Sequence, residues 1–219
     1  MNLPQMPHYC KTDVIGSLSF FNSDNIEIMK GFADNEFDLA IVDPPYGIDV
    51  NSMTLGGGKY KNKGKNWDNE TPPQAYFDEL FRVSKNQIIW GANYMIDKIK
   101  KPSMGWIYWD KENGDSDFSD GELAFTSFKR ALRSYKHHLS KDRSERFHPT
   151  QKPVGLYRFC LDKYAKQGDK ILDTHLGSGS IAIACHDYNF DLIACELDKD
   201  YYLSAMKRIT DHQKQLTIF

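Results

Sequence analysis

The sequence predicts an α/β fold in which helices cover both faces of a doubly wound, mostly parallel sheet of seven strands. Short apolar runs alternate along the chain with segments of helical periodicity, which is typical of parallel strands joined by crossover helices. A glycine-rich turn at 173–180 also joins an apolar run to a helix-like segment, as in sheets that bind ligands at the carboxyl ends of their strands.

Apolar runs predict the strands, and helical periodicity predicts the segments between them. Helices are expected at about 25–33 and 73–84, and the second follows Thr71-Pro72-Pro73, a typical helix start. A third helix begins at about 179, and a closing helix spans about 199–214. The expected strands are 18–21, 37–42, 87–90, 105–109, 123–128, 170–173 and 191–195.

Length and composition are those of one globular domain. The chain has 219 residues, and its hydrophobic fraction of 40% excludes a disordered, collagen-like or coiled-coil protein. The four cysteines form no CxxC pair, which favours a reduced cytoplasmic protein. No apolar run approaches the roughly 20 residues of a membrane span. The net charge of −2 gives no indication of a nucleic-acid partner.

The charges are nevertheless unevenly distributed. Residues 110–122 carry six acids against one base, and residues 129–146 carry seven bases against two acids. The long loop expected at 47–70 has lysines at alternate positions and is functional or mobile. Each charged run could be a solvated face, and the basic run at 129–146 could instead follow phosphates. The candidate DNA-binding residues are Lys59, Lys61, Lys63, Lys65, Arg130, Arg133, Lys136, Lys141 and Arg143.

Asp43-Pro44-Pro45-Tyr46 directly follows the apolar run 37–42. Two prolines cannot donate to a strand ladder, so the strand ends at the sheet edge where ligands bind. If Asp43 and the Pro44 carbonyl accept the two hydrogens of an exocyclic amino group, its nitrogen can direct its lone pair at an electrophile. Tyr46 can stack on the base that carries this group. The alternative is a strand-ending turn with incidental residues.

A second candidate site is the turn Asp173-Thr174-His175-Leu176-Gly177-Ser178-Gly179-Ser180. Its glycines allow a tight turn and the close approach of a ligand to the backbone at a helix N-terminus. Glu196 ends the next expected strand about 20 residues later, where a carboxylate can bind the hydroxyl pair of a ribose. Taken alone, this pattern fits a dinucleotide site equally well.

The two motifs and their order resemble the β-class, or permuted, DNA amino-methyltransferases. These enzymes methylate adenine N6 or cytosine N4 with S-adenosylmethionine, and many serve in restriction–modification. As in that family, the Asp43–Tyr46 motif precedes the glycine turn, and Phe147-His148-Pro149-Thr150-Gln151-Lys152-Pro153 resembles an element that lies between them. The stretches 21–24 and 38–42 are also similar. The resemblance covers nearly the whole chain and implies a Rossmann-like methyltransferase sheet with circularly permuted motif order.

The resemblance also implies roles for individual residues. The catalytic residues would be Asp43, Pro44, Pro45 and Tyr46. Asp24 matches an acid that contacts the cofactor's adenine, although it could equally cap the helix at 25–33. The cofactor-binding residues would be Asp24, Asp43, His148, Pro149, Thr150, Lys152, Asp173, His175, Leu176, Gly177, Ser178, Gly179, Ser180 and Glu196.

The glycine turn departs from the family at Thr174 and His175, where the family has Pro and Phe. The family's aromatic ring packs near the adenosine of the cofactor, and His175 offers a less hydrophobic ring. This departure concerns the affinity for S-adenosylmethionine and not its identity. The seven histidines show no metal-ligand spacing, so no metal is expected.

The implied function is transfer of a methyl group to adenine N6, because Asp at the first motif position favours adenine. The target base would have to be flipped out of the duplex or single-stranded, with 47–70 folding over it. Three alternatives stay open: a cytosine-N4 DNA methyltransferase, an RNA adenine-N6 methyltransferase, and a non-catalytic relative that binds nucleic acid. About 100 residues separate the two halves of the site, so we expect a short recognition sequence, or one read with a second subunit.

We interpret residues 1–219 as one methyltransferase domain. It comprises a catalytic half at about 14–128, a basic recognition segment at about 129–146 and a cofactor half at about 147–214. The tail Gln215-Leu216-Thr217-Ile218-Phe219 resembles the peptide by which bacterial replication proteins dock on the sliding clamp, or packs on the protein's own surface. We expect a cytoplasmic, nucleoid-associated monomer or homodimer of bacterial or phage-like type, with DNA and no membrane as partner.

Overall fold

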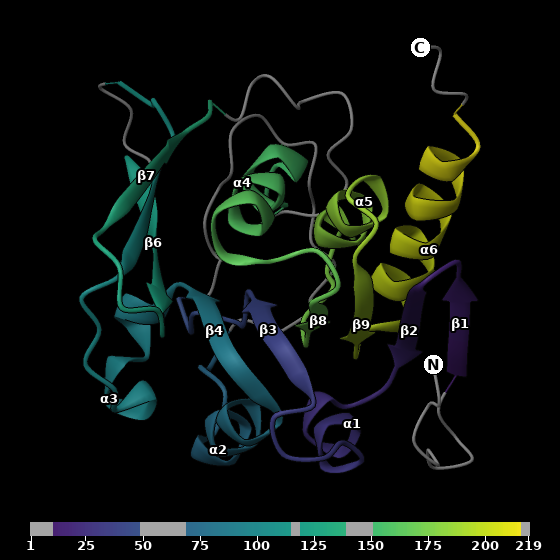
Figure 1. The fold of residues 1–219 in the computed structure, drawn as a ribbon, viewed down its shortest axis with the longest axis horizontal. Helices are drawn as coiled ribbons and strands as arrows, with labels where there is room; N and C mark the ends of the chain where they lie inside the picture. Colours follow the sequence, from purple (N-terminus) through teal and green to yellow (C-terminus); the bar gives the residue numbers. More distant parts are fainter. Residues whose placement is uncertain (1–10, 49–68, 115–118, 139–150, 216–219) are drawn as a thin grey trace.

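The computed structural model describes residues 11–48, 69–114, 119–138 and 151–215 (Figure 1). A central sheet runs across the molecule, and helices pack against both of its faces. Within these ranges, none of the helices has the length and apolar character needed to cross a membrane.

The sheet has nine strands in the order β1-β2-β9-β8-β3-β4-β6-β5-β7. The five strands from β2 to β4 pair in parallel, and β7 pairs in parallel with β5. The β1–β2, β4–β6 and β5–β6 pairs are antiparallel, so the sheet is mixed but mostly parallel. The strands are β1 (Lys11–Ile15), β2 (Leu18–Asn22), β3 (Phe37–Val42), β4 (Ser84–Trp90), β5 (Trp106–Asp110), β6 (Gly121–Thr126), β7 (Arg133–Lys136), β8 (Lys170–Asp173) and β9 (Asp191–Glu196).

The expected number of seven strands is wrong, because β1 and β7 were not expected. These two strands form the edges of the sheet. Their described side chains are exposed or partly exposed, and none is buried. An edge strand with solvent on several sides needs no apolar run, so the hydrophobic pattern gives no signal for it.

The expected helices are all present, within a few residues of the expected bounds. Three further helical segments were not expected. Two of them, at 92–94 and 96–99, are too short to show periodicity, whereas α4 buries Leu156, Cys160 and Tyr164 at helical spacing. The helices are α1 (Asn25–Lys30), α2 (Gln74–Val83), the 3-10 helix η2 (Ala92–Tyr94), α3 (Ile96–Ile99), α4 (Val154–Tyr164), α5 (Ser180–Asp187) and α6 (Lys199–Gln213).

Two apolar clusters lie on the two faces of the sheet. Because side chains alternate along a strand, Leu39 and Ile41 of β3 pack on the side of α4, α5 and α6. Ala40 and Val42 of the same strand pack on the side of α1 and α2. The helices are therefore divided between the faces, as the doubly wound pattern predicts.

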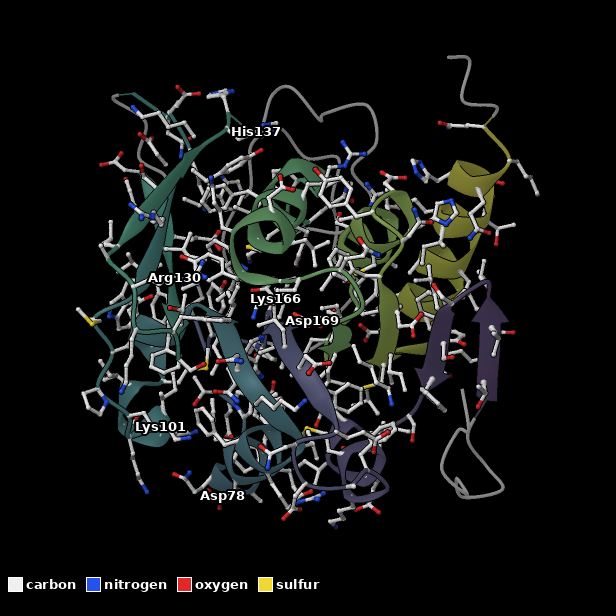
Figure 2. All side chains as sticks on the ribbon, in the orientation of Figure 1. Asp78, Lys101, Arg130, His137, Lys166 and Asp169 are labelled. Carbon is white, nitrogen blue, oxygen red and sulfur yellow. The ribbon has the colours of Figure 1, made fainter. Side chains whose placement is uncertain are left out.

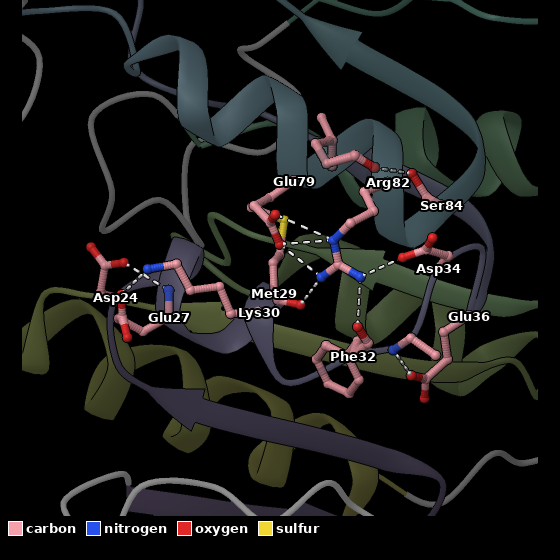
Figure 3. A network of polar contacts seen from close by, with 12 residues as sticks. Asp24, Glu27, Met29, Lys30, Phe32, Asp34, Glu36, Glu79, Arg82 and Ser84 are labelled. Atoms are coloured by element: carbon pink, nitrogen blue, oxygen red, sulfur yellow. Dashed lines mark hydrogen bonds and ion pairs between the residues drawn. The ribbon is translucent and has the colours of Figure 1, made fainter.

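Arg82 connects the two helices beneath β3. Its guanidinium donates to the backbone carbonyls of Met29 and Phe32 at the end of α1, at 2.9 Å each. It also pairs with Glu79 of its own helix at 2.7 Å and with Asp34 at 2.8 Å (Figure 3). A cation that binds the last carbonyls of a helix stabilises its C-terminus, so Arg82 holds α1 against α2.

The strands that lead into the two motifs are neighbours. β3 pairs in parallel with β8, with Leu39 opposite Ile171 and Ala40 opposite Leu172. Because both strands run in the same direction, the turns that follow them lie at the same edge of the sheet. The prediction that the two motifs meet there is confirmed.

Candidate active site

The turn after β3 carries Asp43, whose carboxylate contacts a buried lysine. Lys152 precedes α4 and is 2% exposed, and its Nζ lies 2.6 Å from Asp43 Oδ2. The Tyr46 hydroxyl donates to Asp43 Oδ1 at 2.7 Å and accepts from Lys152 Nζ at 3.0 Å. The structure thus brings together two predicted catalytic residues and one residue predicted to hold the cofactor.

A second carboxylate, Glu122 of β6, completes this arrangement. Its Oε2 lies 3.0 Å from Lys152 Nζ, and its Oε1 lies 2.7 Å from Lys111 Nζ. We call Asp43, Glu122, Lys111 and Lys152 the ion-pair cluster. Sequence reasoning placed Glu122 and Lys111 in a charged stretch and missed this role, because no local spacing relates them to Asp43.

The cluster separates the acidities of its two carboxyl groups. Burial opposes the ionisation of Glu122, but the positive charges of Lys152 and Lys111 lower its pKa to about 2. Burial raises the pKa of Asp43; Lys152 acts against this rise, and the negative charge of Glu122 adds to it. Burial also disfavours the charged form of Lys152, yet its two carboxylate partners raise the pKa of the ammonium. Asp43 is therefore the more basic carboxylate.

The Tyr46 ring packs between other parts of the chain. It stacks on Tyr94 with ring centroids 5.3 Å apart and planes 14° apart. The backbone of Gly91 lies against the ring, because a Cβ at Gly91 would come within 2.0 Å of Tyr46 Cε1. Gly91 also has a φ of +65°, which favours glycine.

A cavity of about 570 Å³ opens beside Asp43 and extends to the glycine turn. Predicted residues on its wall come from all three motifs. The unexpected wall residues come mainly from the chain before α1, from α4 and from the start of α6. The wall residues are Ser23, Asn25, Asp43, Pro45, Gln151, Lys152, Tyr157, Thr174, His175, Leu176, Gly177, Ser178, Glu196, Leu197, Asp198, Lys199 and Tyr201.

The glycine turn and Glu196 bind each other. The backbone N–H of Gly177 donates to Glu196 Oε2 at 2.8 Å, and that of Asp198 donates to Oε1 at 2.9 Å. Gly177 and Gly179 have φ angles of +51° and +75°. The turn therefore needs glycine at both positions, and it fixes the carboxylate on the cavity wall.

Asp173 and Asp24 have structural partners. Asp173 is buried, and its Oδ1 accepts from the His175 backbone N–H at 3.0 Å. Burial raises the pKa of Asp173 to about 8. Asp24 is exposed and caps α1, accepting from the N–H groups of Ile26 and Glu27 at 2.9 and 3.1 Å (Figure 3). It does not line the cavity. A contact of Asp24 with a cofactor stays a prediction.

Thr174 and His175 join a chain of hydrogen bonds across the cavity wall. Tyr76 OH lies 2.7 Å from Thr174 Oγ1, which lies 2.9 Å from His175 Nδ1. Asn25 Nδ2 donates to His175 Nε2 at 3.0 Å, so the ring carries its proton on Nδ1. Burial lowers the pKa of His175 to about 3, and the ring is therefore neutral at physiological pH. His175 is thus an uncharged aromatic ring on the cavity wall.

In the described part of the basic segment, Arg130 and Arg133 line a hollow of about 540 Å³ together with Lys163 of α4. The Arg130 guanidinium donates to the Lys163 carbonyl in the last turn of α4. Lys152 precedes the first residue of this helix, and the 11 residues of α4 put the two ends about 16 Å apart. Arg130 and His137 also lie well apart on either side of β7 (Figure 2). Lys136 is exposed and lies 3.4 Å from Asp110. Arg130 is thus placed as a cation at a helix C-terminus.

Several predicted residues lie outside the described ranges. They belong to the long lysine loop, to the segment before Gln151 and to the tail, and their proposed roles stay predictions. They are Lys59, Lys61, Lys63, Lys65, Lys141, Arg143, His148, Pro149, Thr150 and residues 216–219.

Comparison with known proteins gives consistent matches. Residues 89–207 match the family model N6_N4_Mtase, described as DNA methylase. The Type II methyltransferase M.HpaI of Haemophilus parainfluenzae is 26% identical over 85% of this chain and 72% of its own. The crystal structure of the M1.HpyAVI–SAM complex has a TM-score of 0.60 at 20% identity, covering 87% of this chain and 99% of its own. PvuII DNA methyltransferase (cytosine-N4-specific) has a TM-score of 0.55 at 14% identity, covering 89% and 90%. These structures share the fold.

Proposed function

The chain belongs to the N6/N4 DNA methylase family, and from this premise we propose that it transfers a methyl group from S-adenosylmethionine to adenine N6 in DNA. The observation that supports this most directly is the position of Asp43 on the wall of the cavity that also contains the glycine turn. An amino group held by the Asp43 turn would face the contents of that cavity.

The cavity fits S-adenosylmethionine in size and in chemistry. Its volume of about 570 Å³ lies in the range of small-molecule sites. Each oxygen of Glu196 accepts one backbone N–H and can accept a second hydrogen bond, as from a ribose hydroxyl. The neutral His175 ring offers an aromatic surface on the same wall. When bound, the cofactor supplies an electrophilic methyl group on a positively charged sulfur.

The residues of the turn would activate the amine by position and charge. Asp43 would accept one amino hydrogen, and the Pro44 carbonyl would accept the other. Because Tyr46 and Lys152 fix the Asp43 carboxylate, it need not reorganise as positive charge develops on the nitrogen. Positioning and hydrogen-bond acceptance would supply most of the rate enhancement.

The target base is the finer part of the proposal. The Asp at the first motif position favours adenine, whereas the structural likeness to PvuII DNA methyltransferase, named as cytosine-N4-specific, keeps cytosine N4 as the second candidate. In either case a base within a duplex must leave the stack to reach Asp43. Phosphate contacts by the basic residues would make DNA binding weaken steeply with salt.

Methylation of DNA from a methylase-deficient bacterium tests the proposal. The purified protein would be incubated with this DNA and S-adenosylmethionine carrying a labelled methyl group, with RNA as a parallel substrate. Mass spectrometry of the nucleosides should find label in N6-methyladenine. Label in N4-methylcytosine or in RNA would replace the proposed substrate. Loss of label with Asp43→Ala, with S-adenosylmethionine binding kept in calorimetry, is expected of the catalytic residue. Binding without any transfer by the wild type would identify a non-catalytic relative.

A further inference from the structure

Glu122 lies 76 residues from Tyr46 in the sequence, yet its Oε2 lies 3.0 Å from both the Tyr46 hydroxyl and Lys152 Nζ. We propose that Glu122 is a positioning residue for methyl transfer: it holds Lys152, which in turn donates to the Tyr46 hydroxyl, so that the Asp43 carboxylate stays available to the target amine. This inference rests on the proposed function of the site.

The hydrogen bonds of Lys152 carry the first part of the argument. An ammonium has three N–H donors, and Lys152 Nζ has three acceptors: Asp43 Oδ2 at 2.6 Å, Glu122 Oε2 at 3.0 Å and Tyr46 OH at 3.0 Å. The side chain is 2% exposed, so water cannot replace a lost acceptor easily. Without the Glu122 charge, Lys152 would be drawn toward Asp43 and would cover the carboxylate that the amine needs.

The distribution of charge in the ion-pair cluster also supports the proposal. Asp43, Glu122, Lys111 and Lys152 sum to zero when all four are ionised. Glu122 contacts both lysines, whereas Asp43 contacts Lys152 alone. Glu122 therefore neutralises much of the positive charge, and Asp43 keeps negative charge for the reacting nitrogen.

This charge is required by the chemistry of the transfer. As the N–C bond forms and the S–C bond of the donor breaks, one positive charge passes from the sulfur to the amino nitrogen. The product becomes neutral when one N–H proton leaves to Asp43 and then to solvent. Two carboxylates of separated acidity suit this division of roles, because Glu122 stays ionised while Asp43 is the more basic.

Other titratable groups also face Asp43. They are Tyr46 in the same turn, Lys152 before α4, Glu122 of β6 with Lys111 behind it, Asp173 of β8, Tyr157 of α4 and Tyr76 of α2. Burial raises the pKa values of Tyr46, Tyr76 and Tyr157 well above 10, so these phenols stay neutral. Asp173 has a pKa of about 8 and is protonated below pH 7. Glu196 on the same cavity wall also has a pKa raised by burial, so only a shift that follows substitution of Glu122 or Lys111 reports on Asp43.

Two substitutions should move this profile in opposite directions. Glu122→Gln removes a negative charge that raises the pKa of Asp43, so the acid limb of kcat against pH should move down by about 1 pH unit. At pH 7.5, kcat should fall about 10- to 100-fold, with KM for S-adenosylmethionine little changed. Lys111→Met removes a counter-charge of Glu122, so the acid limb should move up. The proposal would be overturned if the acid limb lay at the same pH in both variants, or if it moved in the same direction in both.

A matched control and a second measurement separate this proposal from the proposed function. Glu36→Gln breaks the Lys170–Glu36 pair, which has the same 2.6 Å distance as Asp43–Lys152 and an exposure of the Glu side chain close to that of Glu122. It should leave the pH profile unchanged. Carboxyl ¹³C NMR titration of Asp43 should show the same opposite shifts without any substrate. If the wild type methylates nothing, the NMR titration still tests the electrostatic coupling between Glu122 and Asp43. If the wild type is active but the Asp43 titration is unchanged in both variants, only the proposed role of Glu122 is refuted.

Discussion

Lys152→Met should destabilise the protein, and by more at pH 8 than at pH 5.5. The substitution keeps most of the side-chain volume and removes the ammonium from a position that is 2% exposed. Asp43 and Glu122 are 16% and 20% exposed, so their charges are poorly hydrated without Lys152. Removing one partner of such a buried ion pair costs about 3–5 kcal/mol. Lys111 still compensates Glu122, which leaves Asp43 as the uncompensated charge.

The pH dependence follows from Asp43. Burial already raises the pKa of Asp43 in the folded protein, and without Lys152 the pKa should rise further. A carboxyl group whose pKa is higher in the folded than in the unfolded state binds protons preferentially when folded, so stability increases as the pH falls. The variant should therefore recover part of its loss at pH 5.5, where Asp43 takes up a proton.

Urea unfolding of the wild type and the variant at both pH values measures this effect. Adding Asp43→Asn to Lys152→Met should restore about 1–3 kcal/mol at pH 8, because the uncompensated charge is then gone. Lys170→Met is the control, because Lys170 is 20% exposed where Lys152 is 2% exposed; water can partly replace its ammonium beside Glu36, so the loss should be smaller, about 1–2 kcal/mol. A loss for Lys152→Met that is the same at both pH values would refute the assignment of this charge to Asp43.

Three further substitutions test other parts of the site. Gly91→Ala should lower the free energy of unfolding in urea by about 1–2 kcal/mol and reduce methyl transfer. The reason is that a Cβ at 2.0 Å from Tyr46 Cε1 displaces that ring and that the φ of +65° disfavours alanine. Full activity of the variant would contradict this prediction. Glu196→Gln should weaken S-adenosylmethionine binding about tenfold in calorimetry, and an unchanged Kd would argue against a ribose contact. The pKa of His175 is about 3, so below pH 6.5 the unfolded chain takes up a proton that the folded chain does not, and the protein loses stability as the pH is lowered. His175→Phe should flatten this dependence of stability on pH between pH 6.5 and 4.

The sequence predicts the centre of the sheet because that centre is buried on both faces. Strands such as β3 and β9 are nearly continuous apolar runs, and turn motifs follow them directly. The edge strands β1 and β7 have mostly exposed side chains, so their pairing depends on backbone hydrogen bonds that hydrophobicity does not encode.

The candidate site, like the sheet, could be predicted from the sequence only in part. Asp43, the glycine turn and Glu196 could be located because each follows a strand at a spacing that its chemistry requires. Glu122 could not, since its partner Lys152 is 30 residues away and depends on the pairing of β4, β6 and β5. Arg130 has a structural partner at the end of α4, the Lys163 carbonyl, and its contact with DNA stays a prediction.

The geometry of the site does not depend on the order of the two motifs along the chain. Parallel pairing of β3 with β8 sets the Asp43 turn beside the glycine turn, whichever strand comes first in the chain. From this pair the sheet continues through β4 on one side and β9 on the other. The helix connections therefore diverge at the carboxyl ends of β3 and β8, where a ligand can enter. Lys152 reaches the same point from the start of the half at 147–214, and its ion pairs bind it to Asp43 and Glu122 of the half at 14–128. The ion-pair cluster therefore links the half of the chain that carries Asp43 to the half that carries the glycine turn, so its loss should affect stability and methyl transfer together.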